Sequence, residues 1–345
     1  MKLNIAVLPG DGIGPEVTDQ AVKALKAIAI EFDHSFTFTY APVGAVAIDE
    51  TGDPLPEQTL DLCKTTDAIL FGAIGDPKYD NNPSATIRPE QGLLKLRKSL
   101  QLFANIRPVK AYSQLLEKSP LKEHIIKGTD ISIYRELTGG IYFGEKYLSD
   151  DKNTASDLCE YSRLEIERIS HLAFKAAQSR SFNVTLIDKA NVLESSRLWR
   201  KVVNDVAKEY QDVTLEFLFV DNAAMQMILN PKQFDVILTE NMFGDIISDE
   251  ASVIGGSIGL LASASVGDKY AMFEPIHGSA FDIMGEGIAN PIGAFWSASM
   301  MLEHLGETGS AQRLMEAIKK LTLDGIYLPQ DLGGNSTTEH VTNAI

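Results

Sequence analysis

The sequence predicts an α/β fold with substantial parallel strand pairing. Short apolar runs of strand length alternate with amphipathic segments of helical length along most of the chain, and this order is typical of βαβ units. Hydrophobic residues make up 44% of the 345 residues, which provides a sizeable core and argues against disorder. A chain of this length has room for about two domains.

The chain opens with a strand over residues 3–8, a glycine-rich loop over 9–15 and a helix from Glu16 to about Ile30. The glycines of the loop follow a G-x-G-x-G spacing, whereas a Rossmann dinucleotide site needs G-x-G-x-x-G. A loop of this kind can approach a ligand closely, but a tight turn between strand and helix explains it about equally well.

The same alternation continues to the C-terminus, interrupted by two polar stretches. Residues 75–89 are rich in Pro, Asp and Asn and are expected to form a loop. Residues 145–157 are polar and irregular and are expected to belong to a protruding arm near 138–158. The other expected elements are strands at 36–40, 68–73, 103–108, 131–136, 184–187, 213–220, 234–239 and 271–274, and helices at 55–62, 90–100, 161–180, 199–206, 223–229, 291–305 and 309–323.

An acidic segment, residues 240–252, reads Glu-Asn-Met-Phe-Gly-Asp-Ile-Ile-Ser-Asp-Glu-Ala-Ser and follows an apolar strand. Gly244 is expected to give a turn, after which a helix begins with Asp245 and Asp249 on one face. Ile247 lies on the opposite side and is expected to face a core. Two carboxylates held close together suit Mg²⁺ or Mn²⁺. At this spacing an ordinary surface pair is the commoner explanation, because the helix dipole alone favours acids in a first turn.

Two further charged residues, Lys189 and Asp221, come directly after expected strands. Ligands of open α/β sheets bind at the carboxyl ends of the strands, so both are candidates for the same site as the acid pair. A lone lysine in such a position is usually a surface residue. Tyr142 stands among glycines and could donate a proton, although a packed tyrosine is the ordinary alternative.

Three arginines, Arg97, Arg107 and Arg135, lie in otherwise apolar surroundings. A buried guanidinium needs an anion, and its planar fork matches a carboxylate. Each arginine taken singly is better explained by a structural salt bridge. Together with the acids, the lysine and the tyrosine, the three predict metal-assisted chemistry on a small dicarboxylate.

The bulk properties argue against several other classes of protein. The net charge of −16, from 47 acidic and 31 basic residues, argues against a nucleic-acid partner or an anionic membrane. No apolar run approaches the ~20 residues of a membrane span, and the N-terminal run is too short for a signal peptide. Cys63 and Cys159 are expected to be reduced thiols of a cytoplasmic protein. The histidines have no zinc spacing, and the chain has no P-loop and no G-x-S-x-G motif.

Eight segments carry a resemblance to a known family: Val7-Leu-Pro-Gly-Asp-Gly-Ile-Gly-Pro-Glu16, Leu93-Leu-Lys-Leu-Arg97, Asn105-Ile-Arg-Pro108, Arg135-Glu-Leu-Thr-Gly-Gly-Ile-Tyr-Phe-Gly144, Asp188-Lys-Ala-Asn-Val-Leu-Glu194, Val220-Asp-Asn-Ala-Ala-Met225, the acidic segment from Glu240 to Asp249, and Glu274-Pro-Ile-His-Gly-Ser-Ala280. With them the chain resembles, over nearly its whole length, the β-decarboxylating dehydrogenases of isopropylmalate and isocitrate. The resemblance implies two domains with one large mixed sheet that spans both, and not a Rossmann fold. Residues 1–102 and 256–345 would form the cofactor-side domain, and residues 103–255 the substrate, metal and dimerisation domain.

The resemblance also implies a role for each candidate residue. Asp245 and Asp249, joined by Asp221 of the partner subunit, would bind Mg²⁺ or Mn²⁺. Lys189 would act with Asp221 across the interface of a homodimer to remove the C2 hydroxyl proton. Tyr142 would protonate the enolate after loss of CO₂. The residues expected to bind the substrate carboxylates are Arg97, Arg107 and Arg135.

The implied reaction is oxidative decarboxylation of (2R,3S)-3-isopropylmalate to 4-methyl-2-oxopentanoate, a step in leucine biosynthesis, with NAD as the hydride acceptor. Asp282 would accept the ribose 2′-hydroxyl and repel a 2′-phosphate, which favours NAD over NADP. Two departures from the family pattern, Phe281 and the segment 328–331, leave the role of Asp331 open. The isopropyl group would contact Glu90, Leu93, Leu94 and Val192, and the expected cofactor residues are Ile13, Glu274, His277, Gly278, Ser279, Ala280, Asp282 and Asn290.

Other substrates and other classes of protein stay open as alternatives. An isocitrate or homoisocitrate enzyme would need polar groups where Leu93 and Leu94 stand, because an unpaired carboxylate is costly to bury. The same leucines argue only weakly against D-malate as the substrate. The alternatives from other classes are a metal-dependent phosphoryl-transfer enzyme that uses the loop at 9–15, and a dicarboxylate-binding protein without catalysis.

Overall fold

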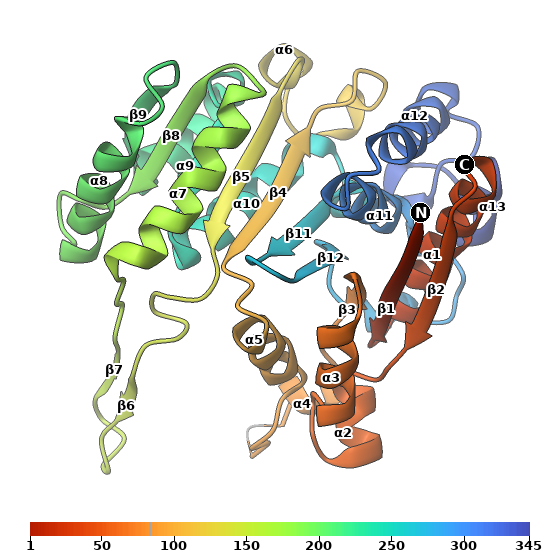
Figure 1. Ribbon diagram of the computed structural model, residues 1–345, viewed down its shortest axis with the longest axis horizontal. Coiled ribbons are helices and arrows are strands. Elements are labelled where there is room, and N and C mark those ends of the chain that lie inside the picture. Colours follow the sequence, from red (N-terminus) through yellow and green to blue (C-terminus); the bar gives the residue numbers. More distant parts are fainter. Residues whose placement is uncertain (83) are drawn as a thin grey trace. The chain divides into compact units, whose positions relative to one another are not determined.

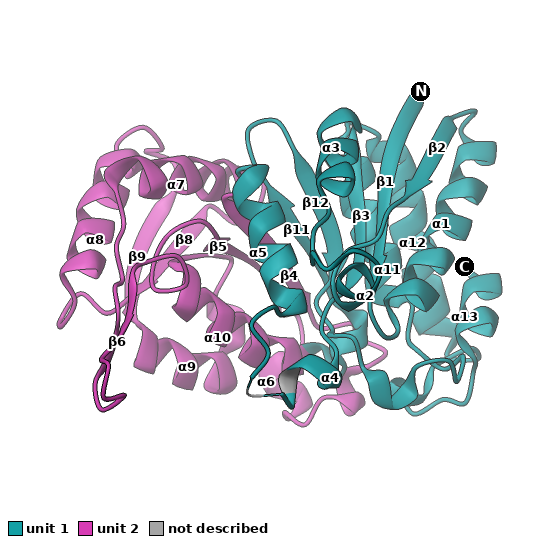
Figure 2. Cartoon of the chain, turned by 90° about the horizontal axis from the view of Figure 1, so that it is seen from below, with its two compact units in different colours: residues 1–102, 255–345 teal, residues 103–254 magenta. Residues whose placement is uncertain are grey.

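A computed structural model describes residues 1–82 and 84–345 of the chain. The chain divides into two compact units, of which unit 1 contains Met1–Leu102 and Gly255–Ile345 and unit 2 contains Phe103–Ile254 (Figure 2). Among the described residues, ten strands form one mixed sheet, as expected, and each unit contributes five of them. The remaining position, Pro83, belongs to the stretch 75–89 that was expected to be a loop, and it lies outside the described residues.

Unit 1 has the strand order β2-β1-β3-β12-β11. Its pairs are parallel except for β11 and β12, which run antiparallel. Both ends of the chain belong to this unit (Figure 1). Its strands are β1 (Lys2–Gly10), β2 (Ser35–Tyr40), β3 (Ala68–Ala73), β11 (Ala262–Val266) and β12 (Ala271–Pro275), and its helices are α1 (Gly14–Glu31), α2 (Ala45–Thr51), α3 (Glu57–Thr65), α4 (Pro77–Asp80), α5 (Pro89–Ser99), α11 (Ile292–His304), α12 (Thr308–Asp324) and α13 (Thr338–Ala344).

Unit 2 has the strand order β4-β5-β10-β8-β9. The β4–β5 pair is antiparallel and the other pairs are parallel. Helices α7 and α8 pack on each other, as do α9 and α10. The strands are β4 (Ala104–Lys110), β5 (Asp130–Glu136), β8 (Asn183–Asp188), β9 (Thr214–Phe219) and β10 (Val236–Thr239), and the helices are α6 (Glu123–Ile126), α7 (Arg163–Gln178), α8 (Glu194–Ala207), α9 (Val220–Leu229) and α10 (Asn241–Ser252).

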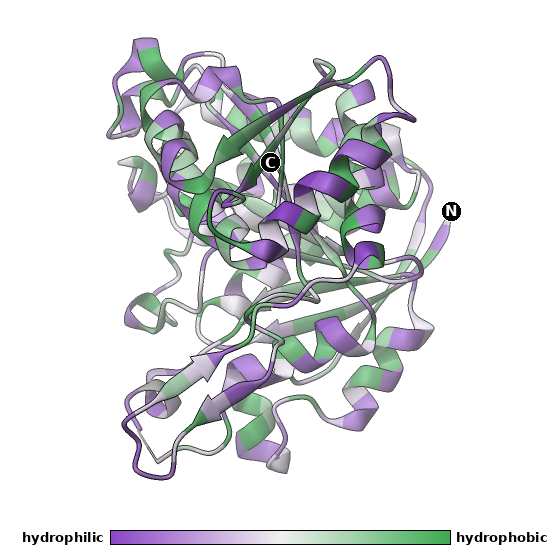
Figure 3. Cartoon of the chain, turned by 90° about the vertical axis from the view of Figure 1, so that its left-hand side faces the viewer, coloured by the Kyte–Doolittle hydropathy of each residue, from purple (hydrophilic) through white to green (hydrophobic). Residues whose placement is uncertain are grey.

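Many helices are amphipathic, α1 and α8 among them, and hydrophobic and hydrophilic segments alternate along the ribbons in Figure 3, whereas α11 is buried on nearly all sides. In α1 the apolar residues at helical spacing are buried, as the sequence predicts: Val17 and Leu25 are fully covered. In unit 2 the core cluster joins the sheet residues Ile133 and Ile237 to Ile247 of α10. Ile247 therefore faces the core, as expected, and the opposite side of α10 is left for polar side chains.

The start of α10 differs from the sequence-based expectation. The helix begins at Asn241, so Gly244 lies inside it and gives no turn, and Asp245 stands one turn later than expected. Glycine is required there by close packing, because a Cβ on Gly244 would lie 2.6 Å from Cγ of Arg135 and 2.9 Å from Cγ2 of Thr239. The glycine thus brings α10 directly against the ends of β5 and β10.

The arm also differs from the expectation, because it is not irregular throughout. Strands β6 (Lys146–Leu148) and β7 (Ala155–Asp157) pair antiparallel as a small separate sheet that extends away from the strands of unit 2 (Figure 1). All six of its strand residues are exposed. Short apolar and polar residues alternate too briefly in this segment to predict a hairpin from the sequence.

Further elements escaped sequence-based prediction, among them the four-residue helices α4 and α6. Strand β11 reads Ala-Ser-Ala-Ser-Val and is fully buried, but its small residues lack the hydropathy of a core strand. Helices α2 and α13 are only seven residues long, which is too short for a periodic signal. Strand β4 continues two residues past Pro108, the residue at which the sequence predicts its end.

Candidate active site

The carboxyl end of β10 places the first polar groups of the site. Glu240 caps α10, because its Oε1 accepts a hydrogen bond from the backbone N–H of Phe243 at 2.8 Å. Its Oε2 accepts a second bond from the hydroxyl of Tyr161 at 2.9 Å. Burial raises the pKa of the Glu240 carboxyl above its usual range. The cap fixes where α10 begins, and so where its acid pair lies.

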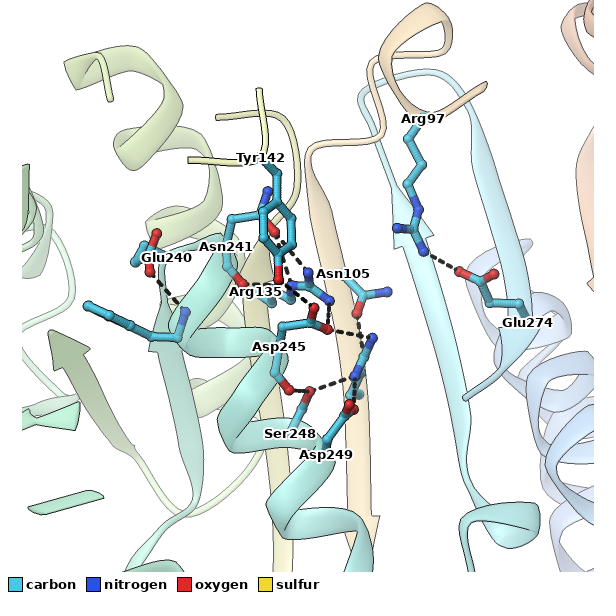
Figure 4. A network of polar contacts seen from close by, with 12 residues as sticks. Arg97, Asn105, Arg135, Tyr142, Glu240, Asn241, Asp245, Ser248, Asp249 and Glu274 are labelled. Carbon is cyan, nitrogen blue, oxygen red and sulfur yellow. Dashed lines mark hydrogen bonds and ion pairs between the residues drawn. The ribbon is translucent and has the colours of Figure 1, made fainter. Parts of the chain in front are cut away.

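Asp245 is the centre of the polar network on α10 (Figure 4). Its Oδ1 accepts a hydrogen bond from Nη1 of Arg135 at 2.5 Å, and its Oδ2 accepts one from the hydroxyl of Tyr142 at 2.9 Å. Nη2 of Arg107 forms an ion pair with the same Oδ1 at 3.6 Å. One carboxylate therefore collects two guanidinium groups and a phenol.

Arg107 bridges the two members of the acid pair. Its Nη1 donates to Oδ1 of Asp249 at 2.8 Å and to Oγ of Ser248 at 2.6 Å. Its Nε donates to Oδ1 of Asn105 at 2.8 Å. Asp245 and Asp249 thus lie on one side of α10, as predicted, and both of their carboxylates contact cationic groups that an anionic substrate would also attract.

Tyr142 keeps its proton over the whole ordinary pH range. Partial burial and the hydrogen bond to Asp245 raise the pKa of its phenol to about 12. The guanidinium carbon of Arg135 lies 5.8 Å from the ring centroid. A protonated phenol held beside a carboxylate and two cations has the arrangement that a general acid needs.

Lys189 and Asp221 form a separate ion pair, between Nζ and Oδ1, at the ends of β8 and β9. The hydrogen bond from Lys189 holds the pKa of the Asp221 carboxyl below its usual range. Within residues 1–82 and 84–345 of a single chain, no group of three or more His, Cys, Asp and Glu side chains is arranged to hold a metal ion. The expected set of Asp221, Asp245 and Asp249 would take Asp221 from a second subunit, and it stays a prediction. The two acids on α10 supply the hard oxygen ligands that Mg²⁺ or Mn²⁺ prefers.

In unit 1, two residues expected to bind ligands carry buried polar atoms without partners. Nη2 of Arg97 donates to Oε1 of Glu274 at 2.8 Å, but its Nε has no hydrogen-bond partner among the described residues. His277 has Nδ1 2.9 Å from the carbonyl of Gly278, while its buried Nε2 is unpaired over the same residues. Burial lowers the pKa of His277, which favours the neutral ring. A buried polar atom without a protein partner is free to bond to water or to a bound ligand.

The glycine-rich loop between β1 and α1 is held by a buried carboxylate. Asp11 accepts hydrogen bonds from the backbone N–H groups of Ala45 at 3.0 Å, Val46 at 3.1 Å and Gly75 at 3.0 Å. The N–H of Ile13 donates to the carbonyl of Ser279 at 2.8 Å, which joins two segments expected at the cofactor. Asn290, which is also expected to bind the cofactor, donates a hydrogen bond from Nδ2 to Oδ2 of Asp331 at 2.9 Å.

The other expected site residues differ in exposure. Val192 is 61% exposed, and Asp282 and Gly278 are also exposed. The partly buried ones are Glu90, Leu93, Leu94, Ser279 and Ala280.

Sequence reasoning missed three polar residues that hold the arginines. Asn105 lies on β4 directly opposite Arg135 and two residues before Arg107. Ser248 lies three residues after Asp245 on the same helical face. Asn241, the first residue of α10, contacts Arg135. The spacings of two along a strand and three along a helix could have identified the first two.

The fold is of the α/β class, with one mixed sheet of ten strands among the described residues, and its site gathers carboxylates, guanidinium groups and a phenol on α10. The family model described as isocitrate/isopropylmalate dehydrogenase matches residues 4–345. The chain belongs to this family.

Relatives and solved structures agree with this assignment. The chain is 54% identical over 345 residues to a 3-isopropylmalate dehydrogenase of Wolinella succinogenes, which covers 99% of this chain and 95% of the relative. It is 53% identical over 331 residues to a 3-isopropylmalate dehydrogenase of Bacillus subtilis, which covers 94% and 90%. A crystal structure of isocitrate dehydrogenase from Methylococcus capsulatus matches with a TM-score of 0.88 at 34% identity, and the match covers 99% of this chain and 98% of that one.

Proposed function

We propose that the chain catalyses the oxidative decarboxylation of (2R,3S)-3-isopropylmalate to 4-methyl-2-oxopentanoate, with NAD and Mg²⁺ or Mn²⁺, in leucine biosynthesis. The support comes from the two relatives above, both named for this activity and both more than half identical to this chain. The single observation that carries the chemistry is the Asp245 carboxylate, which holds the protonated Tyr142 and the buried Arg135 together.

In this proposal the chain's own residues bind the substrate and move its protons. Bound NAD would accept the hydride from C2, and the divalent cation would supply Lewis acidity. Lys189 and Asp221, which pair with each other, would together help to remove the proton of the C2 hydroxyl group. After CO₂ has left, Tyr142 would donate its phenol proton to the substrate carbon from which CO₂ was lost. The pKa of Tyr142, about 12, keeps the phenol protonated until that step.

Different side chains would bind the carboxylates of the substrate and its isopropyl group. Arg97, Arg107 and Arg135 would bind the two carboxylates, because guanidinium groups match carboxylates in geometry and charge. Glu90, Leu93, Leu94 and Val192 would contact the isopropyl group. The third carboxylate of isocitrate would meet no positive partner in that set, which favours isopropylmalate.

The cofactor is proposed to be NAD, bound by residues of unit 1. The unpaired Nε2 of the buried His277 supports this role, because it can bond to a ligand without breaking an existing hydrogen bond. The exposed Asp282 would accept the ribose 2′-hydroxyl and repel a 2′-phosphate. The remaining proposed contacts are Ile13, Glu274, Gly278, Ser279, Ala280 and Asn290.

Unit 1 is proposed as the cofactor-side domain, and unit 2 as the substrate, metal and dimerisation domain. Exposed apolar side chains on α9, on α10 and directly after α10 support dimerisation, because exposed large apolar groups are typical of interaction sites. Helices α9 and α10 pack on each other. We call these residues the α9/α10 surface, namely Met225, Ile228, Leu229, Ile246 and Val253, which are between 42% and 62% exposed.

A cytoplasmic location is also proposed. It is supported by Cys63 and Cys159, which are both free thiols. Separately, no helix in the described part of the chain is long and apolar enough to span a membrane.

A substrate panel tests the proposal. We expect the highest kcat/KM for 3-isopropylmalate among four acids, namely 3-isopropylmalate, isocitrate, homoisocitrate and D-malate, each measured with NAD and with NADP. A preference for one of the other three acids would overturn the substrate, and a preference for NADP would overturn the cofactor. Nucleotide hydrolysis without NADH formation would indicate a phosphoryl-transfer enzyme. Binding of a dicarboxylate without turnover would indicate a dicarboxylate-binding protein without catalysis.

A further inference from the structure

We infer that Asn241 is a positioning residue, whose side-chain amide orients the Arg135 guanidinium and also fixes the Tyr142 loop (residues 139–144). The role in catalysis rests on the proposed function, whereas the mechanical link between Asn241 and the loop stands on the structure alone. Asn241 is the first residue of α10 and is 1% exposed, so its amide is shielded from water.

Asn241 holds one edge of the Arg135 guanidinium. Its Oδ1 accepts hydrogen bonds from Nη2 of Arg135 at 2.9 Å and from Nε at 3.2 Å. The backbone carbonyl of Asn241 accepts a further bond from Nε at 2.9 Å. A planar guanidinium held along one edge has its rotation fixed, and Nη1 is thereby directed at Asp245.

The other end of the same amide holds the Tyr142 loop. Nδ2 of Asn241 donates to the carbonyl of Gly139 at 3.1 Å. The loop then turns tightly, with the N–H of Gly144 donating to the carbonyl of Gly140 at 3.0 Å. Tyr142 lies inside this turn, and its hydroxyl reaches Asp245 at 2.9 Å. The bond from Asn241 is thus one of three that hold the start of this loop, beside those from the N–H of Gly139 to Glu136 at 2.7 Å and from the N–H of Gly140 to the carbonyl of Glu160 at 3.0 Å.

The chemistry of the contacts explains why an asparagine stands at this position. Only one orientation of the amide pairs an acceptor with the guanidinium and a donor with the carbonyl, and the network therefore assigns it. An aspartate would keep the bonds to Arg135 but place a carboxylate oxygen against the carbonyl oxygen of Gly139. A leucine of similar volume would lose both side-chain contacts and keep only the bond from Nε of Arg135 to the backbone carbonyl.

The two contacts converge on the two oxygens of one carboxylate. Arg135 bonds to Oδ1 of Asp245 and Tyr142 to Oδ2. Asn241 thus aligns a substrate-binding cation and a proton donor relative to the same acid. A misplacement of about 1 Å at such a site can cost on the order of 10²-fold in rate.

Two variants, Asn241→Leu and Asn241→Asp, separate these contributions. Amide hydrogen exchange of the segment 139–144 is measured on the full chain without metal, substrate or cofactor, and kcat and KM are measured with 3-isopropylmalate and NAD. Asn204 provides matched controls, Asn204→Leu and Asn204→Asp, since its Nδ2 also donates to a backbone carbonyl, that of Arg200 at 2.8 Å, on an exposed part of α8.

We expect faster exchange of the loop in both Asn241 variants, with kcat lower by about tenfold or more. The KM for 3-isopropylmalate should also rise in Asn241→Leu, which loses the Arg135 contact, while the KM for NAD stays unchanged. The Asn204 variants should behave as the wild type. Unchanged loop exchange in both Asn241 variants would overturn the inference, as would equal effects in the Asn204 controls.

The same experiment separates the failure of the inference from that of the proposed function. A wild-type chain without turnover on any of the four acids would overturn the function and, with it, the catalytic role of Asn241. The exchange measurement needs no activity, and faster exchange would still support the mechanical link.

Discussion

Replacing Asp245 by asparagine should remove most of the metal-dependent turnover while leaving the chain folded. The substitution keeps an acceptor for Arg135 but removes the charge that strengthens the bonds from Arg135 and Tyr142. Losing charge assistance in two hydrogen bonds costs about 2–3 kcal/mol, against a typical stability of about 5–15 kcal/mol. The fold should therefore survive at moderate temperature.

The effect on catalysis should be much larger than the effect on stability. Lewis-acid stabilisation by a divalent cation contributes several kcal/mol, and each ~1.36 kcal/mol is a factor of ten in rate. Loss of one of the two carboxylates on α10 should lower kcat/KM by about 10³-fold. NADH formation measures turnover, calorimetric titration with Mn²⁺ measures metal affinity, and thermal unfolding measures stability.

Asp130→Asn is a matched control for this experiment. Asp130 also bonds to two cationic side chains, Lys110 at 2.6 Å and Arg180 at 2.8 Å, but it lies at the start of β5. This variant should lose some stability and keep full turnover and Mn²⁺ affinity. If Asp245→Asn kept its affinity for Mn²⁺, with or without turnover, Asp245 would not be a metal ligand.

Three further predictions concern the tyrosine and the dimer. Tyr142→Phe should slow protonation after decarboxylation by about 10²–10⁴-fold, the usual contribution of a general acid, and hydride transfer much less; equal slowing of both steps in single-turnover kinetics would count against the role. The folded-state pKa of Tyr142, about 12, lies above the unfolded value of 10, so its stabilisation is complete below pH 10 and is lost as the pH rises towards 12. The stability difference between wild type and Tyr142→Phe, from urea unfolding, should therefore shrink over that range, and a constant difference would contradict the assignment. Ile246→Glu, on the α9/α10 surface, should give a folded and inactive monomer by light scattering, and an active dimer would place the interface elsewhere.

Much of the fold follows from periodicity, and the exceptions have physical causes. The sequence predicts β3 to the residue and the buried face of α1, because apolar residues there recur at strand or helical spacing. It misplaces the start of α10, because Gly244 signals a turn in isolation. Only the packed structure shows that Arg135 excludes any side chain at that position.

The sequence predicts which charged residues belong to the candidate site, but it does not predict all the polar residues that they contact. Asp245, Asp249, Arg107 and Arg135 were identified from helical spacing and from charge in apolar surroundings, and the structure brings all four together. The role of Asn241 could not be predicted, because a polar residue at a helix start is ordinary. Its partners lie on strand β5 and on a loop about a hundred residues earlier in the chain.

The buried Asp11 has a consequence for any ligand of the glycine-rich loop. Its three bonds to backbone N–H groups tie the loop to the first turn of α2 and to Gly75 before a ligand is present. Ordering a free loop costs about 1–2 kcal/mol of conformational entropy per residue. Here the loop is ordered when the chain folds. The affinity for a ligand would therefore not be reduced by the entropy cost of ordering the loop on binding. Weaker ligand binding caused by a change at Asp11 would then be an entropic effect and would not require contact between Asp11 and the ligand.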